Sequence, residues 1–370
     1  MDSPKYRQLF ESLKNDIVAG RYRPGQKLPS EAALVRRSSM SRITVTRALR
    51  ELQNAGLVER FAGSGTFVPK TGSDQRSALL FGLLIPELGK TEIFAPICHA
   101  IQSAPAAKPH ALLWGNVSAG GTIAKQALTL ADQFIARKVD GVFFAPLESW
   151  ADAEKINRRI LRQLRKSKIA VVLLDRRVSS SFDRDRADLT GINHRQAAYS
   201  AAEHLLAVGC RRLCFIEDNG APSTLSERRA GFHQAAATYQ IVPDHAPVVN
   251  VEKLASEFRK RIRTRKVDGI VCVNDHTAGR VMQMLIRWGV RIPAEVRIVG
   301  IDDVNYAAML PIPLTSVKQP IEQIGDAALN LMLERIRSPY RPTREVLLDG
   351  TLVVRESSGV VANRSHATTR

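Results

Sequence analysis

The feature that most constrains the fold is a repeated alternation of short apolar runs with amphipathic helical patterns. The apolar runs are typical of buried strands and lie at Leu79–Ile85, Ala111–Trp114, Gly141–Ala145, Ala170–Leu174, Arg212–Ile216, Gly269–Val273 and Val296–Ile301. Helical patterns lie at Thr122–Arg137, Ala153–Lys166, Gln196–Val208, Glu227–Tyr239, Ala278–Trp288 and Ile321–Arg337. Continuous apolar strands indicate parallel sheets covered on both faces, so we predict an α/β fold of two similar doubly wound lobes.

Composition narrows the class of protein. A length of 370 residues suggests two or three compact units, and 44% hydrophobic with 24% charged residues is typical of a globular chain. No apolar run approaches the roughly 20 residues that span a bilayer, and the N-terminus lacks a signal-peptide pattern, so we expect a cytoplasmic protein. Cys98, Cys210, Cys214 and Cys272 form no paired motif. We therefore expect reduced thiols, no metal site and no cofactor.

The chain is strongly basic, with a formal net charge of +18. Such a charge favours contact with a polyanion but does not distinguish DNA, RNA and a membrane surface. Residues 1–70 hold 13 Lys+Arg and 6 Asp+Glu, a net charge of +7, and are the more basic part per residue. The remaining +11 is spread over 300 residues, where a solvated surface is one interpretation.

The first 68 residues predict a winged helix-turn-helix. A helix over Tyr6–Ala19 is followed by a short helix that Ser30 caps, and a third helix runs over Ser41–Asn54. Two short apolar runs, 57–60 and 66–68, surround Gly63 and Gly65 and predict a two-stranded wing. We predict a DNA-binding domain over 1–68, a linker over 69–77, an effector domain over 78–358 and a flexible tail over 359–370.

This head closely resembles the gluconate-repressor (GntR) family. The motifs that carry the resemblance are Leu28-Pro29-Ser30-Glu31, Ser41-Arg42-x-Thr44-Val45, Ala48-Leu49-x-x-Leu52, Gly56-Leu57 and Gly63-x-Gly65-Thr66-Phe67. The N-terminal end of a recognition helix reads base edges in the major groove, and Arg binds guanine there. The candidate DNA-binding residues are Ser41, Arg42, Thr44, Thr46, Arg47, Gly63 and Gly65. Thr46 stands where the family usually has Arg, which puts the role of Arg47 in doubt.

From about Leu79 to Ser358 the chain resembles the effector domain of the lactose/galactose-repressor (LacI/GalR) family, which is itself similar to periplasmic sugar-binding proteins. The resemblance rests on motifs at 171–176, 204–213, 228–232, 268–275, 299–303 and 314–319. It implies a ligand in the cleft between the lobes, at the carboxyl ends of the strands. The combination of this head with this domain resembles the arabinose-responsive repressors.

Polyols need carboxylates to accept from their hydroxyls and Arg or Asn to donate to their oxygens. The candidate ligand-binding residues are Asp175, Arg228, Asp275, Asn274, Gln319, Arg176 and Phe94. Phe94, or else Trp150, is the aromatic ring on which a sugar would stack. For Asp275 the alternative is a helix cap, and for Arg228 a surface charge. Asp302 and Asp303 are interpreted as loop and hinge positions.

An enzyme is excluded on motifs, because the chain has no GxGxxG between strand and helix, no P-loop, no HExxH and no GxSxG. The predicted function is sequence-specific transcription regulation, as a repressor whose affinity for operator DNA changes with a small polar effector, a sugar. Its predicted partners are a palindromic operator, the effector and a second copy of the chain. Two alternatives stay open: a large domain used only for dimerisation, and a non-sugar ligand such as a purine.

Overall fold

The computed structural model describes residues 4–359 apart from 24, 55–56, 62–63, 69–77, 87–91, 116–121, 149–151, 180–186, 218–222, 243–247, 251–258, 261, 263 and 265. It divides into two compact units, Met1–Ala78 and Leu79–Arg370. The predicted linker over 69–77, residues 360–370 of the predicted tail, Gly63 and Trp150 lie outside the described residues. In the described part of the chain, no helix is long and apolar enough to cross a membrane.

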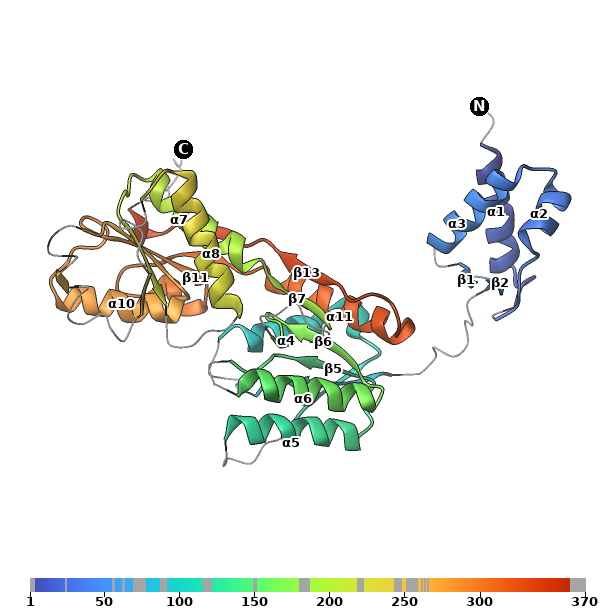
Figure 1. Ribbon diagram of the computed structural model, residues 1–370, viewed down its shortest axis with the longest axis horizontal. Coiled ribbons are helices and arrows are strands. Elements are labelled where there is room, and N and C mark those ends of the chain that lie inside the picture. Colours follow the sequence, from blue (N-terminus) through green and yellow to red (C-terminus); the bar gives the residue numbers. More distant parts are fainter. Residues whose placement is uncertain are drawn as a thin grey trace, which may run out of the picture. The chain divides into compact units, whose positions relative to one another are not determined.

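The first unit, called the head below, is a three-helix domain with a small hairpin (Figure 1). Its elements are α1 (Lys5–Val18), α2 (Glu31–Ser38), α3 (Arg42–Asn54), β1 (Glu59–Phe61) and β2 (Gly65–Phe67). Leucines on α1, α2 and α3 pack with Val45 and Ala48 into one core, and the two strands pair antiparallel. Ser30 caps α2 by accepting a hydrogen bond from the Ala33 amide. The winged helix-turn-helix predicted from the sequence is confirmed.

Lobe 1 of the second unit is a six-stranded parallel sheet in the order β13-β7-β6-β5-β3-β4. Its strands are β3 (Leu80–Leu84), β4 (Ala111–Trp114), β5 (Gly141–Phe144), β6 (Ala170–Leu174), β7 (Asp188–Ile192) and β13 (Glu345–Leu348). Helices α4 (Phe94–Ser103) and α11 (Ile321–Arg337) cover one face, and α5 (Ile123–Ala136) and α6 (Ala153–Lys166) cover the other (Figure 1). Each face holds its own apolar core.

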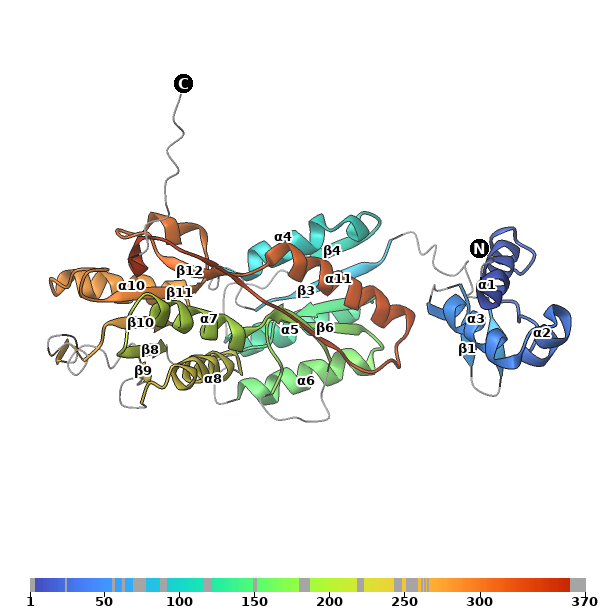
Figure 2. The ribbon, with the colours of Figure 1, turned by 90° about the horizontal axis from the view of Figure 1, so that it is seen from above.

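Lobe 2 is built in the same way, in the order β14-β12-β11-β10-β8-β9. Its strands are β8 (Leu213–Glu217), β9 (Val248–Asn250), β10 (Gly269–Cys272), β11 (Arg297–Asp302), β12 (Thr315–Lys318) and β14 (Thr351–Val353). All pairings are parallel except that of β14, which lies antiparallel on β12. Helices α7 (His194–Ala207) and α8 (Ser223–Thr238) cover one face, and α10 (Asp275–Arg287) covers the other (Figure 2).

Three segments cross between the lobes: β7 to α7, β12 to α11, and β13 to β14. They meet at Gly350, where an added Cβ would lie 2.7 Å from Val317 Cγ1, 2.9 Å from the Lys318 carbonyl oxygen and 3.0 Å from Ile192 Cδ1. Glycine is therefore the residue that lets the three crossings pack together. The two-lobed, doubly wound architecture predicted from the alternation is confirmed.

Candidate functional site

In the head, two hydroxyls fix the start of α3. Ser41 Oγ accepts a hydrogen bond from the Thr44 amide at 3.3 Å and lies 2.8 Å from Thr44 Oγ1. A serine in this position satisfies an amide that the helix itself leaves without a partner. Ser41 and Thr44 therefore lie together at the helix end that the resemblance assigns to DNA.

The carboxylate of Glu31 organises the side chains around that end. Thr46 Oγ1 donates to Glu31 Oε2 at 3.3 Å, and Arg42 Nε lies 3.8 Å from the same oxygen. Arg60, from the wing, forms an ion pair with Glu31 Oε1. The Arg42 side chain is nevertheless 84% exposed, so its guanidinium is accessible to a ligand.

The other two predicted DNA-binding positions in the described residues have contacts within the head. The Arg47 guanidinium lies over the Tyr6 ring at 3.9 Å from its centroid, so Arg47 packs against α1. Gly65 has a φ of +125°, and an added Cβ would lie 2.5 Å from Lys27 Cε. Glycine at 65 thus has a structural reason that is independent of DNA.

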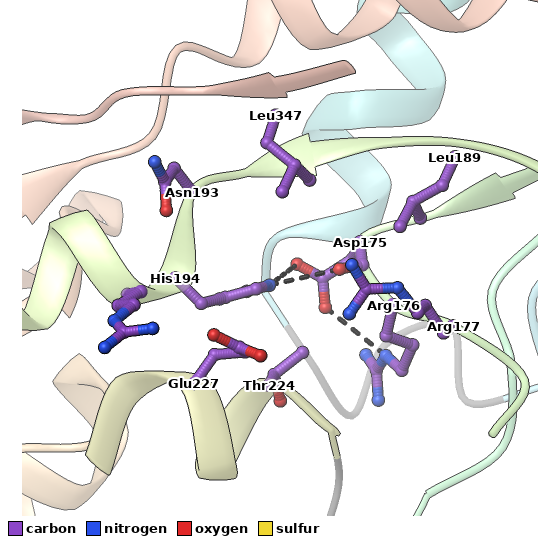
Figure 3. A pocket seen from close by; sticks show the side chains of 10 residues that line it. Asp175, Arg176, Arg177, Leu189, Asn193, His194, Thr224, Glu227 and Leu347 are labelled. Carbon is purple, nitrogen blue, oxygen red and sulfur yellow. Dashed lines mark hydrogen bonds and ion pairs between the residues drawn. The ribbon is translucent and has the colours of Figure 1, made fainter. Parts of the chain in front are cut away.

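In the cleft, Asp175 lies directly after β6 and is 4% exposed. The His194 ring at the start of α7 lies against it, with Nε2 3.2 Å from Asp175 Oδ1 and 3.1 Å from the Asp175 carbonyl oxygen (Figure 3). His194 Nδ1 accepts a hydrogen bond from Arg228 Nε at 3.2 Å. Because the guanidinium only donates, Nε2 is the ring nitrogen that carries the hydrogen toward Asp175.

Arg228 extends this chain of polar contacts into lobe 2. It is 6% exposed, donates to the Val273 carbonyl and lies 3.2 Å from Asp302 Oδ1. Gln319 Nε2 donates to the same Asp302 oxygen at 2.8 Å. We call Asp175, His194, Arg228, Asp302 and Gln319 the cleft network. It joins the carboxyl end of a lobe 1 strand to those of lobe 2 strands.

Two buried acceptors of the cleft network can each take a further hydrogen bond. Gln319 Oε1 has no hydrogen-bond partner among the described residues, and Asp175 Oδ1 faces His194 Nε2 at 3.2 Å. A buried acceptor without a donor costs roughly 1–3 kcal/mol. A ligand with several hydroxyl donors would bind to both.

Asp275 lies beside the cleft network rather than in it. Ser316 Oγ donates to Asp275 Oδ1 at 2.6 Å, and the Val304 amide donates to Oδ2 at 3.0 Å. Asn274, and not Asp275, caps α10, since its Oδ1 accepts from the Thr277 amide at 2.8 Å. Both predicted residues are thus at the right strand end, with their side-chain oxygens held by the protein.

The predicted aromatic and its neighbouring arginine also lie together. The Arg176 guanidinium is 5.2 Å from the centroid of the buried Phe94 ring and forms an ion pair with Glu148. A small cavity lies beside these side chains, lined also by Ile85 and Leu147. Lobe 1 therefore offers one apolar ring and a guanidinium at the carboxyl ends of its strands.

A second, larger pocket lies where the lobes meet. Figure 3 shows His194 and Asp175 on one side and Glu227 and Thr224, from α8, on the other. Arg177 lines it too, and that guanidinium is held by Glu345 at 2.7 Å and 2.5 Å. The pocket is therefore lined by both donors and acceptors of hydrogen bonds.

The carboxylates of the two lobes differ in pKa. Burial alone would raise the pKa of Asp175, but the attraction and hydrogen bond of His194 and the charge of Arg228 outweigh it and lower the pKa. Burial, and then the nearby Asp302, raise the pKa of Asp275 to about 8. Burial also raises the pKa of Asp302 despite Arg228. At neutral pH the carboxylate of lobe 1 is thus ionised, whereas the buried Asp275 of lobe 2 retains its proton.

Sequence reasoning missed His194, Glu227 and the part played by Asp302. His194 follows a strand that the apolar pattern did not reveal, and it lies far in sequence from Arg228. Asp302 was interpreted as a hinge position, yet it contacts both Arg228 and Gln319. The acidic pair at the end of β11 was the one signal for it.

Comparison with known proteins agrees with the two parts of the molecule. Residues 5–68 match the family of bacterial regulatory proteins called gntR, and residues 202–358 match the periplasmic binding protein-like domain. The arabinose metabolism transcriptional repressor of Geobacillus stearothermophilus is 23% identical over 96% of this chain and 98% of its own length. Its counterpart in Halalkalibacterium halodurans is 24% identical over 96% of each chain.

Solved structures share the fold. A LacI-family transcriptional regulator from Enterococcus faecium with bound ribose has a TM-score of 0.59 and 21% identity, over 75% of this chain and 98% of that one. The lac repressor dimer bound to operator and an anti-inducer has a TM-score of 0.62 and 20% identity, over 86% and 89% of the chains. The effector domain therefore has the periplasmic-binding-protein-like fold.

Proposed function

We propose that this chain is a DNA-binding transcriptional regulator and not an enzyme, and that it represses transcription until a sugar binds between its lobes. Its head matches the gntR family of bacterial regulatory proteins, and its second unit matches the periplasmic binding protein-like domain. The cleft network carries the proposal. It joins both lobes through Asp175, His194 and Arg228, and it leaves Gln319 Oε1 without a hydrogen bond in the described part of the chain.

The pKa values in the cleft suit a polyol. Each sugar hydroxyl both donates and accepts a hydrogen bond. An ionised Asp175 accepts from hydroxyls, while the Arg228 guanidinium donates. Phe94 supplies an apolar surface for a ring, and Arg176 beside it supplies a further donor. An uncharged ligand with many hydroxyls matches this mixture better than a purely anionic one.

The proposed partners follow from the two domains. We propose that the chain acts in the cytoplasm as a homodimer on a palindromic operator, because a two-fold pair of heads matches a two-fold DNA site. Its relatives are named as repressors of arabinose metabolism, and the similar lac repressor is a dimer on its operator. Closure of the lobes around the crossings at Gly350 would change how the heads engage DNA.

Calorimetry tests the effector. The full chain is titrated with L-arabinose, ribose, cellobiose and hypoxanthine, and binding of at least one sugar is expected. For the sugar that binds, Asp175→Asn should lower the affinity at least tenfold, about 1.4 kcal/mol, because the substitution removes an ionised acceptor. Asp349→Asn, an exposed carboxylate at a crossing, is the control and should bind as the parent does. Binding of hypoxanthine alone, or of nothing at 10 millimolar (about ten times a weak Kd), contradicts a sugar effector.

A second experiment tests the DNA contacts. Ser41, Arg42, Thr44 and Thr46 are proposed to face the operator, with Arg42 reading a base. Arg42→Ala should then cost about 1–3 kcal/mol of specific affinity and relax the base preference in a selection from random duplexes. Arg50→Ala, on the same helix and also exposed, is the matched control. An equal loss on every sequence would make Arg42 a phosphate contact instead.

A further inference from the structure

Lobe 1 carries a row of exposed cations where its helices return to its strands. Lys108 precedes β4, Arg137 and Lys138 precede β5, and Lys166 and Lys168 precede β6. We call these five residues the basic edge. None of them has an ion pair within the described residues. Their charges are therefore directed to solvent.

The sheet places these residues at one level. Strands β6, β5, β3 and β4 are neighbours in that order, and the register pairs Ala170 with Gly141, Gly141 with Phe81, and Leu80 with Ala111. Lys108 and Lys138 lie three positions before their strands, Lys168 lies two before its strand, and Lys166 lies four before the same strand. With neighbouring strands about 4.8 Å apart, the row spans roughly 15 Å.

Two of the lysines occupy an unfavourable backbone conformation. Lys138 has a φ of +52° and Lys168 a φ of +58°, directly after the ends of α5 and α6. Glycine is the residue that adopts this conformation without a steric cost. In lobe 2, Gly209 and Gly289 occupy it after α7 and α10, and Gln240 occupies it after α8 with a φ of +57°. Lysine at 138 and 168 therefore costs local stability relative to glycine.

The helix dipole does not explain the row either. A cation near a helix C-terminus is stabilised whichever lobe contains the helix. In lobe 2, the arginines at the corresponding edge are paired instead. Arg212 lies 3.2 Å from Asp268, and Arg291 lies 3.3 Å from Glu295. Lobe 2 also has an exposed lysine at this edge, Lys266, three positions before β10, so within the described residues the longer row of unpaired cations lies in lobe 1.

The connection to the head enters lobe 1 inside this row. The Leu79 amide donates to His110 Nδ1 at 3.2 Å, and the Leu80 amide donates to Asp140 Oδ2 at 3.0 Å. His110 follows Lys108 by two positions, and Asp140 follows Lys138 by two. The chain from Val68 to Leu79 spans at most about 40 Å even when fully extended. DNA held by the head therefore stays within a short reach of the basic edge.

We propose that the basic edge of lobe 1 binds the phosphate backbone of the DNA that the head holds, as a second, sequence-independent contact. Duplex DNA carries one negative charge per about 1.7 Å, so a row of this length matches several phosphates. Lysine suits this role because it acts as a mobile point charge and does not need a fixed geometry. The contact accounts for part of the positive charge outside the head.

The test measures how DNA binding by the full chain depends on salt. A fluorescent 30-base-pair duplex of random sequence is titrated at several KCl concentrations, and log K is plotted against log salt. The edge variant is Lys108→Gln, Lys138→Gln and Lys168→Gln. Each lost phosphate contact reduces the slope by about 0.9, so we expect a reduction of about 2 to 3 and at least tenfold weaker binding at low salt.

A control of equal charge separates a local contact from net charge. Lys260→Gln, Lys266→Gln and Arg287→Gln remove three exposed cations from lobe 2. This control should keep the slope of the parent protein within about 0.5, well under one phosphate contact. Equal slopes for the edge and control variants would overturn the proposal. Sugar titrations should be unchanged in both variants, so the test is independent of the effector.

A second variant guards against a folding defect. Lys138→Gly and Lys168→Gly remove two charges and also relieve the two positive-φ lysines, so the melting temperature should stay the same or rise. A slope reduced by about 1.8 in a protein of undiminished stability supports the contact. A slope equal to that of the parent refutes it.

Discussion

The two lobes of the effector domain share one architecture but differ at both edges of their sheets. At the carboxyl edge, lobe 1 presents Asp175, whose pKa is lowered, and lobe 2 presents Asp275, whose pKa is raised to about 8. At the opposite edge, lobe 1 has Lys168 after α6 where lobe 2 has Gly289 after α10. The repeated fold therefore determines where side chains lie, while the type of residue at each position determines what the lobe can bind.

The largest effect is expected from the buried charges of the two lobes. In lobe 2, Arg228 is the one arginine against Asp302 among the described residues, whereas in lobe 1 Asp188 is held by both Arg335 and Arg341. Arg228→Met leaves a buried carboxylate without its cation and should lower the free energy of unfolding by about 3–5 kcal/mol. Arg335→Met should cost less, because Arg341 remains 2.7 Å from Asp188.

Urea unfolding measures both losses. Arg229→Met is the matched control, since the Arg229 side chain is 44% exposed and pairs with Glu217 at the surface. It should cost less than about 1 kcal/mol. If the Arg228 and Arg335 variants lost the same free energy of unfolding, Arg341 would not compensate for the loss of Arg335. The two lobes would then not differ in how their buried carboxylates are stabilised.

The next effect concerns helix packing. In lobe 2 an added Cβ at Gly231 of α8 would lie 1.9 Å from the Arg195 carbonyl oxygen on α7, and in lobe 1 one at Gly325 of α11 would lie 2.6 Å from Ala100 Cβ on α4. Both positions face backbone, at Gly325 the Ala100 carbonyl carbon at 2.7 Å, but the approach at Gly231 is closer. Gly231→Ala should therefore destabilise by about 2–3 kcal/mol and Gly325→Ala by less. Gly279→Ala, with 3.5 Å to its nearest atom, should stabilise by about 0.5–1 kcal/mol.

The melting temperatures of the three glycine variants test this order of stability. If Gly325→Ala proved as harmful as Gly231→Ala, the packing of helix against helix would be equally tight in the two lobes.

The sequence predicted these elements unevenly, for physical reasons. The bounds of β4, β6, α6 and α11 were predicted as observed, because their apolar periodicity is uninterrupted. β7 was missed since Asp188 and Gly191 break its apolar run, and β13 and β14 were missed because they are short strands at the sheet edges. Residues 94–103, which form α4, were also left without an element.

The candidate site was predicted in part. Asp175, Arg228 and Gln319 are brought into one network, as the resemblance implied, but their roles toward a ligand stay predictions. His194 connects two of them through contacts between residues distant in sequence, which no local pattern reveals. The capping roles of Ser41 and Asn274 are local and were partly visible as helix starts.

A third effect is a pH dependence that differs between the lobes. Between its ordinary pKa of 3.8 and its folded-state pKa of about 8, the native state keeps a proton on Asp275 that the unfolded state has released. Rising pH therefore lowers stability across this window, and Asp275→Asn should remove about 1–2 kcal/mol of the loss between pH 6 and 8. Asp175 has the opposite sign, because its stabilisation is lost only as pH falls through its lowered pKa.

Urea unfolding at pH 6, 7 and 8 follows this effect. Asp175→Asn serves as the comparison and should leave the slope across pH 6–8 unchanged, since Asp175 is ionised in both states there. A parent protein whose stability does not fall over this range would contradict the raised pKa of Asp275.

The smallest effect isolates the backbone at the basic edge. Lys138→Gly replaces a lysine at φ +52° and should raise the free energy of unfolding by about 0.5–1 kcal/mol, because the removed strain exceeds the entropy that glycine adds to the unfolded chain. Lys166→Gly removes the same charge from the last residue of α6, where φ is helical, and should lower stability by a similar amount. If both substitutions raised the free energy of unfolding equally, repulsion among the lysines of the basic edge, and not the positive φ of Lys138, would be what destabilises this edge. Lobe 1 would then differ from lobe 2 in charge alone.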